Sequence, residues 1–114
     1  MVEQVAAAPD GTIVDLSQSF AVPWDRAVLM EPYSDGGAMN ARLGFDAYPG
    51  WAMGPQDESN QLVVFVRGTS VVAEADLFPG PGYFRFDPSI AEFPRDSAVF
   101  AVKREGDIVR LLRP

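Results

Sequence analysis

Runs of apolar residues with polar positions between them predict a β-hairpin in the middle of the chain. Residues 62–67 and 70–77 are rich in valine, alanine and leucine, and they flank Gly68-Thr69. Glycine at the first position of a two-residue loop is typical of a type II′ turn, so the two segments should pair. In that register Val63 lies opposite Glu74, and the other face is an unbroken apolar surface that needs a covering layer.

A second hairpin is expected near the end of the chain. Residues 98–103 and 108–112 flank a turn at residues 104–107. Counting outward from that turn pairs Val102 with Val109 and gives one apolar face. We expect this hairpin to join the same sheet as the first. Its apolar face consists of Phe100, Val102, Val109 and Leu111.

One helix is predicted over residues 35–43. Ser34 offers an N-cap, Asp35 places a negative charge at the positive end of the helix dipole, and Gly44 is the kind of residue that ends helices in a left-handed conformation. The two glycines of the first turn each weaken the helix by about 1 kcal/mol relative to alanine. The helix should therefore depend on packing against the sheet, through Met39 and Leu43 on one of its faces.

The remaining segments are shorter or irregular. Strands are expected at residues 12–20 and 27–31, and a short helical turn should begin at Asp87-Pro88-Ser89 and end before Pro94. Residues 45–60 have no helical or strand periodicity, which indicates a long loop. Its large side chains favour a lid over the core, and a functional loop is the alternative. They are Tyr48, Trp51 and Met53.

Together these elements predict an α+β fold: an antiparallel sheet of four to six strands with one principal helix packed on one face. Residues 1–11 end in a Pro-Asp-Gly turn and are expected to form a flexible leader, while residues 12–114 form a single domain. A chain of 114 residues that is 47% hydrophobic supplies one core rather than two.

Two missing residue types exclude several chemistries. The chain has no histidine and no cysteine, which excludes Ser-His-Asp catalysis, thiol nucleophiles, disulfides and metal sites built on these side chains. We therefore expect no enzyme activity and assign no catalytic residue, no cofactor and no metal site. One chemical candidate remains, a carboxylate pair formed by Glu74 and Asp76 on one strand face. The alternative is that this face is simply exposed to solvent.

Charge bears on the class of partner. Sixteen acidic residues outnumber nine basic ones and give a net charge of −7. The basic residues are scattered singly, which argues against nucleic acid and anionic membranes as partners. No apolar window approaches the ~18 residues that cross a bilayer, so no transmembrane segment is expected. A protein partner is expected, and the oligomeric state is left open.

An aromatic segment after the first hairpin is the candidate partner-binding surface. Aromatic and arginine side chains with a polar rim are typical of interface hot spots. The alternative is that alternate residues such as Phe84 and Phe86 close the core. The candidate residues are Phe78, Tyr83, Phe84, Phe86, Arg85 and Arg95, with Phe93 and Asp87 beside them.

Five short motifs occur in an order that resembles a known family. They are Trp24-Asp25-Arg26, Pro32-Tyr33-Ser34, Leu43-Gly44-Phe45, residues 62–67 and residues 94–100. From Trp24 to about Phe100 the chain resembles a family of small, uncharacterised bacterial lipoprotein-like domains. The resemblance implies an extracytoplasmic location, in the periplasm or cell envelope, and a removed N-terminal signal. It implies no activity and no catalytic residue.

The first of these motifs also has a structural interpretation. Trp24 is expected to anchor the start of the second strand, while Asp25 and Arg26 form a local ion pair of small energetic weight.

Three functional hypotheses follow. The first is a non-catalytic binding or accessory domain of the bacterial envelope that binds another protein. The alternative is an acidic inhibitor or immunity-type protein that caps a basic protein surface. The third is a carboxylate-dependent hydrolase, which would require Glu74.

Overall fold

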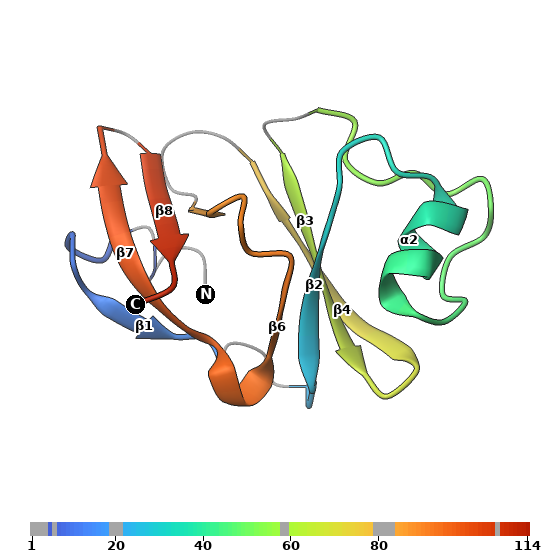
Figure 1. The fold of residues 1–114 in the computed structure, drawn as a ribbon, viewed down its shortest axis with the longest axis horizontal. Helices are drawn as coiled ribbons and strands as arrows, with labels where there is room; N and C mark the ends of the chain where they lie inside the picture. Colours follow the sequence, from blue (N-terminus) through green and yellow to red (C-terminus); the bar gives the residue numbers. More distant parts are fainter. Residues whose placement is uncertain (1–4, 6, 19–21, 58–59, 79–83, 107) are drawn as a thin grey trace.

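Two four-stranded sheets form the frame of the computed structural model (Figure 1). The structure describes residues 5, 7–18, 22–57, 60–78, 84–106 and 108–114. Sheet A consists of β1 (Ile13–Asp15), β7 (Val99–Glu105), β8 (Ile108–Leu112) and β5 (Arg85–Phe86), in that order. Sheet B consists of β4 (Ser70–Leu77), β3 (Gln61–Arg67), β2 (Arg26–Met30) and β6 (Glu92–Pro94), in that order.

The fold is α+β and consists mostly of strands. Among the described residues the principal helix is α2 (Gly36–Leu43), and a 3-10 turn, η1 (Arg95–Ser97), follows β6. Neighbouring strands run antiparallel except β5 and β8, which are parallel. The expected α+β class is confirmed. The expectation that both hairpins belong to one sheet was wrong, because the second hairpin lies in sheet A and the first in sheet B.

The two sheets enclose the main core, which we call the inter-sheet core. Aromatic rings meet there edge to face, with centroids 5.0 Å apart for Phe93 and Phe100 and 5.1 Å apart for Trp24 and Phe65. Residues 62–66 of β3 are buried, so this strand is covered on both faces. A strand that is covered on both faces has a continuous apolar sequence. The expectation that only one face of this hairpin is covered was therefore incomplete. The buried phenylalanines are Phe65, Phe84, Phe86, Phe93 and Phe100.

A bulge shifts the register of the first hairpin. Val66 pairs with Val71 but Phe65 pairs with Ala73, which leaves Val72 as an extra residue on β4. The expected pairing of Val63 with Glu74 is therefore wrong, and Glu74 lies opposite Val64 instead. Compared with the expected pairing, the residues of β4 after the bulge lie on the opposite face of the sheet. Leu77 is buried in the inter-sheet core and the partly buried Ala73 and Ala75 pack against it, whereas Glu74 and Asp76 are exposed on the other face.

The second hairpin has the expected faces but not the expected register. Val102 pairs with Leu111, and the strands continue to a pair between Glu105 and Ile108. Gly106 has a φ of 62°, which allows a turn tighter than expected. A shift of two residues preserves which side chains share a face. Phe100, Val102, Val109 and Leu111 are all buried, as expected.

Two other expectations change in extent or type. The strand expected at residues 12–20 is short, at Ile13–Asp15, and residues 19–20 lie outside the described residues. The turn expected after Asp87 is present as a single turn, closed by the Ile90 N–H donating to the Asp87 carbonyl, but it is not helical, and β6 begins before the chain reaches Pro94. Proline is compatible with β6 because that strand is an edge of sheet B.

Described residues of the expected leader contact the rest of the domain. Val5 is buried against the inter-sheet core, and the Gly11 N–H donates to the Val102 carbonyl at 2.8 Å. In the part of the chain that the structure describes, no helix is long and apolar enough to span a membrane.

Candidate functional site: an anchored aromatic patch

Local signals at both ends define α2. The Asp35 side chain accepts a hydrogen bond from the Ala38 N–H at 2.8 Å, so Asp35 is the N-cap. The expected N-cap, Ser34, is wrong, since its hydroxyl donates to the Glu31 carbonyl. Gly44 ends the helix with a φ of 88°, as expected. The helix therefore begins one residue later than the sequence indicated.

A second apolar cluster, which we call the helix-side cluster, lies between α2 and sheet B. It is separate from the inter-sheet core and consists of aliphatic and methionine side chains. Phe45, Tyr48, Ala52 and Val71 pack against it while partly exposed. Its buried members are Val28, Met30, Met39, Leu43, Leu62, Val64 and Val66.

Asn40 fixes the first part of the loop that follows α2. Its side-chain amide donates to the Tyr48 carbonyl at 2.8 Å, and its side-chain oxygen accepts from the Ala47 and Tyr48 N–H groups. The helix also approaches this loop closely, because a Cβ on Gly36 would lie 1.8 Å from the Pro49 carbonyl oxygen. Glycine is therefore required at this position. The start of the loop is held against the helix.

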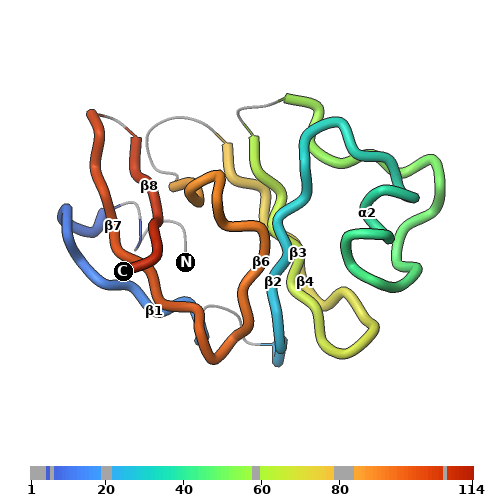
Figure 2. The backbone as a smooth tube through the Cα atoms, viewed as in Figure 1, coloured from blue at the N-terminus to red at the C-terminus, as the bar shows by residue number. Residues whose placement is uncertain are grey.

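A short two-stranded contact fixes the second part of the loop. The Tyr33 N–H donates to the Pro55 carbonyl at 2.6 Å, and the Gly54 N–H donates to the Ser34 carbonyl at 2.7 Å. Asp35 and Met53 form an antiparallel bridge beside them. In Figure 2 the loop runs around α2 as a continuous tube and returns beside the segment that precedes the helix. The loop is thus anchored at both ends.

Three large side chains on these anchored segments are exposed. The exposed fraction is 84% for Trp51 and 56% for both Tyr33 and Met53. We call these three residues the aromatic patch. The expected lid over the core is wrong for Trp51 and Met53, whereas Tyr48 is half-buried on the helix-side cluster. Apolar residues of this size on a fixed surface are typical of interaction sites.

Tyr33 holds an uncommon backbone conformation. Its φ is 62°, and among the described residues it is the non-glycine residue with a positive φ. A left-handed conformation costs an aromatic residue on the order of 1–2 kcal/mol. The hydrogen bond from its N–H to Pro55 helps to hold this conformation. Such strain is enriched at functional sites.

The chain segment that carries the patch is acidic. Residues 31–60 contain five acidic side chains and one basic side chain, Arg42. The guanidinium of Arg42 donates through Nε to the Leu29 carbonyl and lies 3.4 Å from Glu31. Asp35 and Asp46 are exposed carboxylates of this segment. The single cation is therefore directed toward the body of the protein.

The predicted carboxylate pair lies beside this segment. Glu74 and Asp76 are exposed on β4, and the Tyr48 hydroxyl donates to Glu74 Oε1 at 2.6 Å. Burial, and then the hydrogen bond to Glu74, raise the pKa of Tyr48 well above the usual range of a tyrosine. The phenol therefore stays protonated as a donor at neutral pH. Glu74 thus serves to hold the loop over the sheet.

The residues of the aromatic surface expected after the first hairpin differ in burial, so they do not form one exposed surface. Phe84 and Phe86 are each 2% exposed, and Phe93 is fully buried, so the core-closing alternative describes them. Phe78 is 47% exposed. Arg85 is half-buried, and the Arg95 guanidinium lies 5.9 Å from the Trp24 ring centroid. Tyr83 lies outside the described residues.

The motif Trp24-Asp25-Arg26 is structural. Trp24 is buried in the inter-sheet core, as expected of an anchor for β2. The expected ion pair within the motif is wrong. Asp25 accepts a hydrogen bond from the Gly68 N–H, and Arg26 lies 3.6 Å from Glu92. Asp25 thus binds the β3–β4 turn and Arg26 pairs with a residue of β6, and the two charges do not pair with each other.

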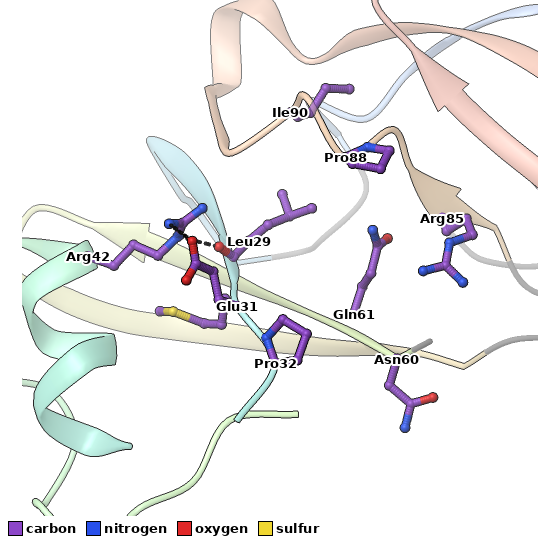
Figure 3. A pocket seen from close by; sticks show the side chains of 10 residues that line it. Leu29, Glu31, Pro32, Arg42, Asn60, Gln61, Arg85, Pro88 and Ile90 are labelled. Carbon is purple, nitrogen blue, oxygen red and sulfur yellow. Dashed lines mark hydrogen bonds and ion pairs between the residues drawn. The ribbon is translucent and has the colours of Figure 1, made fainter. Parts of the chain in front are cut away.

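A cleft of about 250 Å³ opens near the ends of β2 and β5 (Figure 3). Figure 3 shows Arg42 and Glu31 directed toward each other on one side and Arg85 on the other. Gln61 exchanges two hydrogen bonds with the backbone of Phe86, at 2.8 and 3.0 Å. These polar groups are engaged within the protein, which favours the aromatic patch as the interaction site. The apolar walls are Leu29, Met30, Pro32, Pro88 and Ile90.

Comparison with known proteins gives no match to a family model, to a curated protein or to a solved structure. Any functional statement therefore depends on this chain's own residues and on the resemblance noted above.

Proposed function

We propose that this domain is a non-catalytic protein-binding module of the bacterial envelope that binds its partner through the aromatic patch. The observation that carries the proposal is Trp51, which is 84% exposed on a loop that hydrogen bonds hold at both ends. Because the backbone is already ordered, a partner that covers the indole gains hydrophobic free energy at a small entropic cost. Tryptophan and tyrosine are also the residues most enriched among interface hot spots.

Two further considerations support the proposal. The absence of histidine and cysteine from the sequence favours binding over catalysis. The resemblance to bacterial lipoprotein-like domains supports a location in the periplasm or cell envelope.

A pull-down from bacterial envelope extract tests the proposal with three versions of the chain: the wild type, Trp51→Ala and Ile108→Ala. Ile108 is a matched control because it is an apolar side chain, 46% exposed, on sheet A. We expect the wild type and Ile108→Ala to retain the same partner and Trp51→Ala to lose it. Equal recovery by all three would reject the patch as the binding surface. A wild type that retains no protein would reject the binding function itself.

A further inference from the structure

We infer that the surface which covers the aromatic patch is cationic and presents arginine side chains to Trp51 and Tyr33. The inference rests on the proposed function and names the chemistry of the partner. It follows from the charges around the patch and from the ring faces that the patch exposes.

The charges of the chain segment that carries the patch are unbalanced. Five of the sixteen acidic residues lie within residues 31–60, together with one of the nine basic residues. Asp35 and Asp46 are exposed there, and Arg42 is bonded to Leu29 and paired with Glu31. Glu74 and Asp76 extend the acidic surface onto β4. A partner with acidic or neutral side chains would leave these carboxylates without compensation, whereas a basic surface complements them.

The patch also offers aromatic faces. The indole of Trp51 is 84% exposed and the phenol of Tyr33 is 56% exposed, so their faces are accessible to a partner. Cations bind over such faces, and tryptophan is the strongest acceptor. Arginine is favoured over lysine because its planar guanidinium stacks on the ring and is more weakly hydrated. One arginine can thus stack on a ring while its N–H groups donate to a neighbouring carboxylate.

A second copy of this chain is a poorer occupant. Each copy carries a net charge of −7, so two copies repel each other. Lys103, a cation of the opposite sheet, also has an acidic neighbour, since it lies 3.3 Å from Glu105. A separate basic protein meets neither obstacle.

The test uses fluorescent-labelled peptides of equal length: Arg/Ala, Lys/Ala and Glu/Ala. Anisotropy measures their affinity for the full chain at low and high salt. We expect the Arg/Ala peptide to bind more tightly than Lys/Ala, and Glu/Ala not to bind. Trp51→Phe should weaken binding of the Arg/Ala peptide, and Trp51→Ala should weaken it further, by about tenfold or more. Added salt should weaken the wild type as well.

Two features locate the binding. The chain has two tryptophans, Trp24 at 2% exposure and Trp51 at 84%, so acrylamide quenching reports mainly on Trp51. The Arg/Ala peptide should therefore protect the emission from quenching. Asp46→Lys should lower its affinity by about three- to tenfold, whereas Asp96→Lys, the same charge change on an exposed residue of η1, should lower it less than about twofold.

Four results would overturn the inference. One is equal binding of the three peptides, and another is an equal loss from Asp46→Lys and Asp96→Lys, which would indicate net charge alone. The third is concentration-dependent dimerisation in sedimentation velocity that Trp51→Ala abolishes, which would make a second copy the occupant. If the envelope pull-down depends on Trp51 but not on salt or Asp46, the proposed function stands and the cationic partner is rejected.

Discussion

The inter-sheet core and the helix-side cluster are built from different side chains and covered in different ways. The core contains aromatic rings in edge-to-face contact, and a sheet covers it on each side. The helix-side cluster contains aliphatic and methionine side chains, and its cover is an eight-residue helix with the loop that follows. A cover this thin leaves Trp51 on its outer surface. The core holds the fold together, and the second region displays side chains.

The largest effect should come from the core. Phe93→Ala removes a fully buried ring that contacts Trp24, Phe86 and Phe100. We expect a loss of about 3–5 kcal/mol in the free energy of unfolding, because deletion of a buried ring leaves a cavity. Urea unfolding followed by circular dichroism measures it. Phe78→Ala, at a 47% exposed position, is the control and should lose about 1 kcal/mol or less. Equal losses would mean that the core is not closed as described.

The next effect concerns the contact between α2 and its loop. Gly36→Ala places a Cβ against the Pro49 carbonyl, so we expect a loss of about 1–3 kcal/mol. Gly37 is the matched control in the same helical turn, since its nearest contact would be Asp35 Oδ1 at 3.5 Å. Gly37→Ala should stabilise the protein by about 0.5–1 kcal/mol through helix propensity. Thermal unfolding of both variants checks the opposite signs. The same sign for both would contradict the close approach.

A smaller effect distinguishes the two residues before α2. Asp35→Ala removes the N-cap and should lower the free energy of unfolding by about 1 kcal/mol. Ser34→Ala should cost less, because its hydroxyl bonds to the Glu31 carbonyl and leaves the helix N–H groups unaffected. Chemical denaturation of the two variants measures the difference. A larger loss at Ser34 would restore the interpretation made from the sequence.

The smallest effect is expected at the patch itself. Trp51→Ala should change the free energy of unfolding by no more than about 0.5 kcal/mol, because the indole is mostly in solvent. Trp24→Ala is the control with the same change of side chain, and it should lose about 3–5 kcal/mol from the inter-sheet core. Differential scanning calorimetry compares them. A large loss at Trp51 would show that the indole supports the fold.

Much of the fold was predictable where a local signal is strong. Glycine at 68 and the apolar runs on each side of it predicted both strands of the first hairpin, and Gly44 predicted the end of α2. The buried face of the second hairpin was also correct, because side-chain faces survive a register shift of two residues. These features depend on neighbours in the sequence.

The division into two sheets was not predictable in the same way. It depends on how Phe86, Phe93 and Phe100 meet across the core, which involves residues distant in sequence. The candidate site was missed for a related reason. The sequence pattern of a loop with large apolar residues is the same whether the side chains turn inward, as Tyr48 does, or outward, as Trp51 does. The pattern therefore cannot distinguish a lid from an exposed patch. One signal was available, since Asn40 lies on the helix and can bond the loop backbone.

The bulge in β4 makes chain length more important there than composition. Each residue after Val72 lies on its present face because one residue is left out of the pairing. Deletion of Val72 would restore regular pairing and keep Glu74 opposite Val64, but insertion of one residue between Ala73 and Glu74 would turn the carboxylates of Glu74 and Asp76 toward the phenylalanines and Ala75 toward the solvent. Two unpaired charges in an apolar interior are not tolerated in a small domain. Single-residue insertions in β4 beyond the bulge should therefore be selected against more strongly than most substitutions.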